Sequence, residues 1–167
     1  MRTEKRGSAG MSEGGEGQYD AIEVLKSQHR EVEDLFTRFE KSEGDQDRFS
    51  VAQAICHKLE VHSIIEEELL YPIARNAGET GVDGELKEIV LESLEEHQSV
   101  ERIIDDLKES TPDDESLFAR VRVLKEQVLH HVEEEESQLF PRLEQELPRE
   151  ERRSIGKQLL ARTKELD

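Results

Sequence analysis

The sequence has one cysteine, no tryptophan, four prolines and no long apolar run. A lone thiol, Cys56, cannot form a disulfide within the chain, and it cannot supply the paired thiolates of a tetrahedral zinc site. No stretch approaches the roughly 18 apolar residues that a membrane-spanning helix needs, so we expect no membrane partner. The charged, glycine-rich N-terminus also lacks the apolar core of a signal peptide. These absences predict a soluble, cytoplasmic protein.

Basic residues are scarce beside acidic ones, 23 against 41, and the formal net charge is -18. A surface of that sign repels phosphate groups, so we expect no nucleic-acid partner. It attracts cations only diffusely, and acidity alone is weak evidence for a metal site. Sustained alternation of apolar and polar residues is also missing, which argues against β-strands. At 167 residues, the chain is long enough for one domain with a real core.

Apolar residues recur at spacings of three and four over four segments, as in helices with one buried face. Two stripes comprise Ile22, Leu25, His29, Val32, Phe36 and Phe39, and then Ile55, Leu59, His62, Glu66, Leu69 and Ile73. Two more comprise Leu86, Val90, Leu94, His97, Ile104 and Leu107, and then Leu117, Val121, Leu124, Val128, His131, Glu135 and Leu139. Short connections, expected at Gly44 and at residues 76–84 and 111–114, predict an all-α, antiparallel up-down four-helix bundle.

The chain is expected to divide into three parts. Residues 1–18 are rich in Gly, Ser and Glu without periodicity, and they are predicted to be a disordered tail. Residues 19–147 form the predicted bundle. Pro148 breaks the last helix, and residues 148–167 are predicted to form a short amphipathic helix packed on or beside the bundle. Ile155 and Leu159 lie on its apolar side.

The second and fourth segments share a motif, which indicates an internal repeat. In each, glutamate follows histidine by four residues and an aromatic-proline pair comes next: His62, Glu66 and Tyr71-Pro72 in one, His131, Glu135 and Phe140-Pro141 in the other. The first and third segments also match, since Gln28-His29 corresponds to Glu96-His97. Pseudo-twofold stacking of the two helix pairs would bring all four histidines to the bundle centre.

Six polar residues stand where a bundle core normally has leucine: His29, His62, Glu66, His97, His131 and Glu135. Residues four apart share a helix face, so each His-x-x-x-Glu pair directs a nitrogen and an oxygen to one point. A buried ionised carboxylate is costly unless it is paired or coordinated. Two cations would satisfy all six groups, and without thiolate these ligands suit iron, manganese or zinc. We therefore predict a metal pair here, bridged by both glutamates.

Other polar groups near the motifs are assigned more ordinary roles. His57 and His130 fall off the stripes, and we do not expect them to bind metal. Glu67 and Glu136 lie about 100° round the helix from the predicted ligands, and we expect them at the surface or behind the ligands. Tyr71 is expected to pack at the bundle end, with its hydroxyl as a further oxygen near the metals.

With these motifs, the sequence resembles the hemerythrin-like domains named for a repeated His-His-Glu cation-binding motif. The resemblance rests on two repeats, His29 with His62-x-x-x-Glu66 and His97 with His131-x-x-x-Glu135. The aromatic-proline endings and the segment after residue 148 are also similar, so about residues 20–164 are covered. The resemblance implies an oxo- or hydroxo-bridged pair of iron ions in a four-helix bundle. It also implies a small ligand: oxygen, hydrogen peroxide or nitric oxide.

The sequence departs from the oxygen-carrying hemerythrins at two positions. Ser93 stands where those proteins have a fifth histidine, and Glu136 stands where they have a ligating aspartate. The resemblance therefore favours peroxide or nitric oxide chemistry, with catalase-like activity as one form, over reversible oxygen carriage. A sensing module without turnover and a metal-free structural bundle are the alternatives. The sequence predicts neither a catalytic residue separate from the metal ligands nor an oligomeric state.

Overall fold

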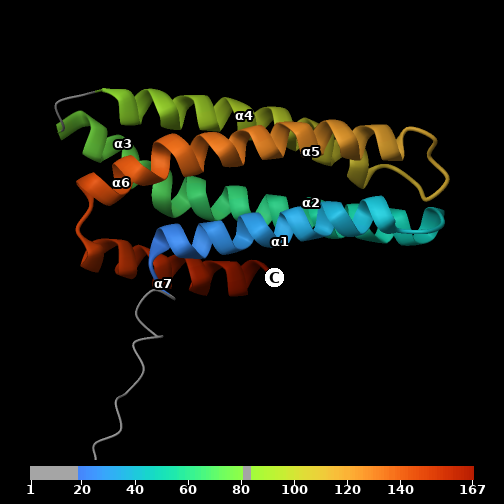
Figure 1. The fold of residues 1–167 in the computed structure, drawn as a ribbon, viewed down its shortest axis with the longest axis horizontal. Coiled ribbons are helices and arrows are strands. Elements are labelled where there is room, and N and C mark those ends of the chain that lie inside the picture. Colours follow the sequence, from blue (N-terminus) through green and yellow to red (C-terminus); the bar gives the residue numbers. More distant parts are fainter. Residues whose placement is uncertain (1–18, 81–83) are drawn as a thin grey trace, which may run out of the picture.

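The structure, a computed structural model, describes residues 19–80 and 84–167, apart from the side chains of residues 78–80. The tail predicted at residues 1–18 lies outside the described residues. Every described element is a helix, and the long helices form an up-down bundle with one further helix along its side (Figure 1). The predicted all-α four-helix bundle is confirmed.

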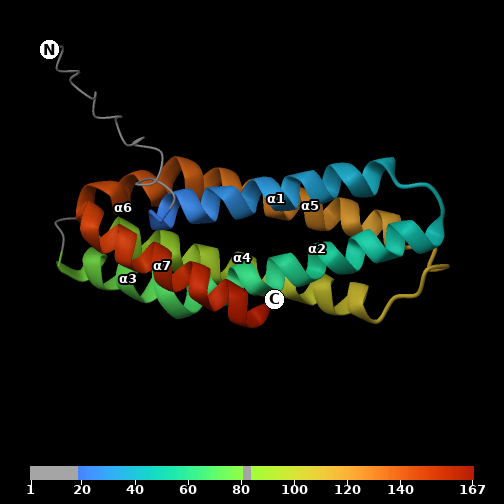
Figure 2. The ribbon, with the colours of Figure 1, turned by 90° about the horizontal axis from the view of Figure 1, so that it is seen from below.

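Four helical stretches run the length of the bundle. The first is α1 (Ala21–Lys41), and the second is the continuous run of α2 (Asp45–Ile65), η2 (Glu66–Leu70) and α3 (Tyr71–Thr80). The third is α4 (Glu85–Lys108), and the fourth joins α5 (Leu117–Glu134), η3 (Glu135–Leu139) and α6 (Phe140–Glu146). The last helix, α7 (Arg149–Leu166), packs against α1, α2 and η2 (Figures 1 and 2).

Local chemistry sets several of the helix boundaries. Asp20 caps α1, since its Oδ1 accepts a hydrogen bond of 3.0 Å from the Ile22 amide. Gly44, at a φ of 87°, turns the chain from α1 into α2 in a backbone conformation that glycine adopts without strain. Pro148 precedes α7 and separates it from α6, because proline cannot continue a helix.

Two connections differ from the sequence prediction. A loop is predicted over residues 76–84, but α3 continues to Thr80, because a single glycine costs a helix only about 1 kcal/mol. The turn predicted at residues 111–114 is present, yet α5 begins later, at Leu117. There the Ser116 amide donates to Asp114 Oδ1 at 2.8 Å and prolongs the turn. Neither difference moves a predicted metal ligand.

The core consists of two apolar clusters that lie on either side of a polar layer. One cluster surrounds Leu25, Leu70 and Leu139, and the other surrounds Phe36 and Leu124. The predicted histidine and glutamate positions lie between these clusters along the bundle. Among the described residues, no helix is both long and apolar enough to cross a membrane.

The helical register shifts at η2 and η3, which are π-helical turns that begin at the two predicted glutamate ligands. A π turn takes in one residue more than an α turn. A uniform helix places Leu69 and Ile73 on the buried stripe, but the structure buries Leu70 and Ala74 and leaves the predicted pair partly exposed. The prediction of those two core positions is wrong, because the stripe resumes one residue later after the π turn.

Candidate metal centre

Six polar side chains meet in the layer between the apolar clusters. They come from six elements: His29 from α1, His62 from α2, Glu66 from η2, His97 from α4, His131 from α5 and Glu135 from η3. Each is less than a tenth exposed, and both carboxylates are completely buried. The structure thus brings together all six residues that the sequence predicts as ligands.

The half of the site nearer α1 and α2 contains two histidines and both glutamates. His29 Nε2 lies 3.2 Å from His62 Nε2 and 3.3 Å from Glu135 Oε2. His62 Nε2 lies 3.2 Å from Glu66 Oε1. Each of these four residues has a ligand atom within 4.8 Å of those of the other three, so one ion between them would meet two nitrogens and two oxygens.

The half of the site nearer α4 and α5 contains the other two histidines together with Glu66. His97 Nε2 lies 3.1 Å from His131 Nε2 and 3.4 Å from Glu66 Oε2. His131 Nε2 lies 3.5 Å from Glu135 Oε2. Glu66 therefore turns one oxygen to each half of the site, which is the placement required of a carboxylate that bridges two ions.

The donor atoms fit a pair of metal ions. Bonds of about 2.1 Å to a shared ion place neighbouring ligand atoms roughly 3 Å apart, close to the separations between these nitrogens and oxygens. Glu66 Oε1 and Glu135 Oε2 are buried and accept no hydrogen bond, although histidine nitrogens face them at 3.2 to 3.5 Å. Buried anionic oxygens of this kind are costly unless a cation is coordinated.

Each histidine turns its other ring nitrogen, Nδ1, outward to an acceptor 2.7 or 2.8 Å away. The acceptors are Glu136 for His29, Gln28 for His62, Glu67 for His97 and Glu96 for His131. Every acceptor belongs to a different helical stretch from its histidine. An Nδ1–H held in this way leaves the Nε2 lone pair free to point at the centre, as metal-binding histidines require.

Charges within the site shift several pKa values. Burial alone would lower the pKa of His97, but Glu66 and other carboxylates outweigh it and raise the pKa to about 10. Burial also opposes protonation of His29 and His131, whose pKa values are nevertheless raised by nearby carboxylates. Burial would raise the pKa of Glu66, but His62 and His97 hold it well below its usual range. A cation entering the site must therefore displace protons from imidazoles.

Tyr71 and Phe140, the aromatic residues of the repeated motif, make different contacts with the site. The Tyr71 hydroxyl donates to Glu135 Oε1 at 2.9 Å and lies 3.4 Å from Glu66 Oε2. Burial and these carboxylates raise the pKa of Tyr71 well above its usual range. Phe140 has no hydroxyl and stacks on His29 at a centroid distance of 5.8 Å. The Tyr71 hydroxyl therefore lies at the site, as the sequence analysis expects.

The residues that the sequence places outside the site are also outside it in the structure. His57 is 49% exposed and His130 is 64% exposed, and neither joins the six buried side chains. Ser93 is buried, and its hydroxyl donates to the Ile89 carbonyl at 3.0 Å. Position 93 therefore contributes no imidazole to the site.

Gln28 and Glu96 are functional candidates that the sequence argument misses. Both accept Nδ1–H bonds from histidines of a neighbouring helix. A signal was present, because each directly precedes the first histidine of its helix pair in the repeat. Which histidine each side chain reaches depends on how the helices pack, and the spacing along the sequence does not contain that information.

Comparison with known proteins identifies the family. Residues 20–143 match the model of the hemerythrin HHE cation binding domain. The chain belongs to this family. Its members are defined by a cation-binding domain, which agrees with the buried donor set described above.

This HHE domain is similar to two known proteins. It is 30% identical over 129 residues to a DNA nickase of Nostoc sp. (strain PCC 7120), a match that takes in 77% of this chain and 35% of the nickase. The chain thus spans about a third of that relative. The crystal structure of an HHE cation binding domain-containing protein from Mycobacterium kansasii matches with a TM-score of 0.71 at 21% identity. That match covers 88% of this chain and 86% of the other, which shows a common fold.

Proposed function

We propose that this HHE domain holds two iron ions and that the iron pair reacts with hydrogen peroxide. The proposed ligands are the six buried residues, His29, His62, Glu66, His97, His131 and Glu135. The observation that carries the proposal is that the two carboxylate oxygens of Glu66 face different halves of the site. Oε1 faces His62 and Oε2 faces His97. Glu66 and Glu135 would be shared by the two ions, and the family resemblance implies an oxo- or hydroxo-bridged pair. Iron is preferred to manganese or zinc because the family resemblance implies it.

The chemistry proposed is peroxide disproportionation. An iron pair, when bound, supplies Lewis acidity and the transfer of two electrons. One peroxide is oxidised to O2 and releases two electrons and two protons, and a second peroxide accepts them to form two waters, so no other reductant is needed. The protein contributes an enclosed site between two apolar clusters, where the Tyr71 hydroxyl donates its proton to Glu135 Oε1 across an oxygen–oxygen distance of 2.9 Å.

Ser93 supports small-oxidant chemistry over reversible oxygen carriage. Its hydroxyl is bonded to the Ile89 carbonyl, and it supplies no fifth imidazole where the oxygen carriers have one. A metal held beside His97 would therefore have one imidazole ligand fewer than in those proteins. Oxygen and nitric oxide are the alternative ligands for that position.

The experiment that tests this proposal follows oxygen release from the iron-loaded protein after hydrogen peroxide is added. We expect catalytic oxygen evolution, which His62→Ala abolishes by removing a proposed ligand. His57→Ala is the matched control, because His57 is exposed and, among the described residues, belongs to no group of potential metal ligands. Fully loaded protein that evolves no oxygen would reject the peroxide reaction.

An iron- or oxygen-responsive sensing module without turnover is the second candidate. The two buried carboxylate oxygens that accept no hydrogen bond favour it, because they couple metal occupancy to the stability of the fold. Its mark is a large metal-dependent change in melting temperature in a protein that leaves peroxide intact.

DNA nicking, the activity named for the Nostoc relative, is not proposed for this chain. The matched region is 35% of that protein, so the activity can reside in the remainder. A formal net charge of -18 also repels a phosphate backbone.

A further inference from the structure

The two halves of the metal centre differ in the groups that support their histidines. Three Nδ1–H groups are directed at carboxylates, those of Glu136, Glu67 and Glu96. The Nδ1–H of His62 is directed at a neutral amide oxygen, that of Gln28, at 2.8 Å. The neutral acceptor is therefore confined to the half of the site that contains His29 and His62.

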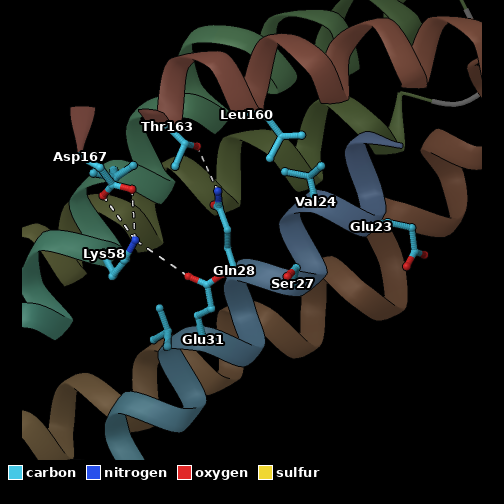
Figure 3. Close-up of a pocket in the computed structure, with 11 residues that line it drawn as sticks. Glu23, Val24, Ser27, Gln28, Glu31, Lys58, Leu160, Thr163 and Asp167 are labelled. Carbon is cyan, nitrogen blue, oxygen red and sulfur yellow. Dashed lines mark hydrogen bonds and ion pairs between the residues drawn. The ribbon is translucent and has the colours of Figure 1, made fainter. Parts of the chain in front are cut away.

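Helix α7 holds Gln28 in one orientation. The Thr163 hydroxyl donates to the Leu159 carbonyl at 2.9 Å, so towards Gln28 it can only accept. It accepts from Gln28 Nε2 at 3.1 Å, a contact drawn in Figure 3. The Gln28 amide oxygen is left to accept from His62 Nδ1–H. This relay fixes the tautomer of His62 and turns its Nε2 to the centre.

The relay lies at the wall of a cavity. The cavity has a volume of about 590 Å³. Figure 3 shows Gln28 of α1 and Thr163 of α7 at its wall, together with Lys58, Glu31 and Asp167. Gln28 is only partly buried. A charge at position 28 would thus be partly solvated, and substitutions there would not disturb the apolar core.

Each group that accepts a histidine Nδ1–H bond is called an outer acceptor below. The charge of an outer acceptor affects the metal through the imidazole. A carboxylate bonded to Nδ1–H makes the imidazole a stronger ligand, and changes to such outer partners typically alter metal affinity about 10- to 100-fold. His62 has an amide where His131, its counterpart in the repeat, has the Glu96 carboxylate. The ion beside His62 should therefore be held less tightly.

We propose that Gln28 makes the two metal positions inequivalent, so that the ion held by His29 and His62 is released first. Gln28 is a positioning residue that acts through His62, and Thr163 positions Gln28. The proposal rests on the two-metal function proposed above. Through Thr163, α7 would then help to set the rate at which the ion beside His29 and His62 is released.

The halves also differ at Arg30, which pairs with the Glu136 oxygen that accepts from His29, and at Tyr71, which must be separated from Gln28. Its hydroxyl lies 3.3 Å from His97 Nε2 and contacts both glutamates. Gln28 and Glu96 make their bonds to other histidines, His62 and His131. Substitutions at positions 28 and 96 therefore test the outer acceptors without altering a contact of Tyr71.

The test follows the release of iron(II) from the doubly loaded full chain into a coloured chelator without oxygen. We expect two phases of one metal each in the wild type, with rates about tenfold or more apart. Gln28→Glu should slow the fast phase until it merges with the slow one, and Glu96→Gln should accelerate the slow phase towards the fast one. Thr163→Val removes the hydroxyl that holds Gln28 and should accelerate only the fast phase. Thr163→Ser keeps a hydroxyl there and should release both metals at the wild-type rates.

The controls separate three outcomes. Tyr71→Phe should keep two phases, and a single phase in that variant would assign the inequivalence to Tyr71 and overturn the proposal. Release by Gln28→Glu in two phases at unchanged rates would also overturn it. A wild-type chain that never takes up two metals contradicts the proposed function itself, and the release experiment then has no metal pair to follow. Melting curves of the metal-free variants establish that each is folded.

Discussion

At the scale of single residues, Glu66 is the side chain that connects the two halves of the centre. It is completely buried, and each of its oxygens faces a histidine of a different half. Glu66→Gln keeps the shape of the side chain but removes the charge, and a neutral amide cannot bridge two cations. We expect at most one metal per chain in this variant, measured as metal content after gel filtration.

Glu133→Gln is the matched control for this substitution. Glu133 lies two residues before Glu135 and is exposed, so Glu133→Gln changes the net charge by the same amount without touching the site. It should keep two metals per chain. Two metals in the Glu66→Gln protein would show that the bridging role assigned to Glu66 is wrong.

Cys56 gives a prediction about the reactivity of its thiol. Burial, with a smaller effect from Glu60, raises the pKa of its thiol to about 12. Because the thiolate is the reactive form, the folded protein at pH 8 should react with a thiol reagent on the order of 10³-fold more slowly than a free cysteine. Labelling in denaturant supplies the fast reference. Rapid labelling of the native protein would mean that Cys56 is not enclosed.

The sequence predicts which six residues share the buried layer, because these polar residues occupy positions of the apolar stripes where a bundle core normally has leucine. Their binding of metal stays a prediction. The sequence does not predict the acceptors Gln28 and Glu96, since both lie off the stripe among many similar surface residues. Packing of one helix against another decides which of those residues reaches a histidine.

At the scale of helices, the π turns at η2 and η3 are the features that the sequence conceals. Each begins at a buried glutamate and delays the following stripe by one residue. A helical pattern read at a period of 3.6 contains no signal for an inserted residue, so Leu70 and Ala74 are missed as core positions. The turns lie where the site needs its carboxylates, and π turns are frequent at functional sites.

The contact between α7 and the start of α1 gives a prediction for Gly156. A Cβ added there would lie 1.7 Å from the Tyr19 carbonyl oxygen and 2.9 Å from the Ala21 amide nitrogen. Since these atoms are backbone, α7 must move away, and we expect Gly156→Ala to destabilise the protein by about 1–3 kcal/mol. Chemical denaturation measures this change.

Gln158→Ala, an exposed substitution two residues further along α7, is the control for Gly156→Ala and should change the free energy of unfolding little. If Gly156→Ala unfolds at the wild-type denaturant concentration, the close docking of α7 is contradicted. The sequence predicts that this helix exists and that Ile155 and Leu159 are buried. It does not predict that α7 lies beside Gln28, because nothing in the pattern of α7 specifies which face of the bundle it covers.

At the scale of the whole molecule, we expect metal binding to stabilise the folded state. The core contains two anionic oxygens that accept no hydrogen bond, so cations that bind only the folded state should stabilise it strongly. A metal concentration of 100 times Kd adds about 2.7 kcal/mol for each site. For a chain of this size that corresponds to a rise in Tm of roughly 5–10 °C or more.

Melting curves with bound iron and after removal by a chelator measure this coupling. We expect the chelator to lower the Tm and added iron to restore it. An unchanged Tm in protein shown to contain two irons would mean that the buried carboxylates are stable without a cation. The result also bears on sensing, because a sensor must convert occupancy into a change in the protein.

The central claim is that two metals lie between six side chains of this bundle. Anomalous X-ray scattering at the iron edge, from crystals of protein produced with iron, tests it most directly. We predict two peaks in the layer between the apolar clusters, one beside His29 and His62 and one beside His97 and His131, with Glu66 reaching both. A single peak, or well-folded protein with no peak in that layer, would contradict the account.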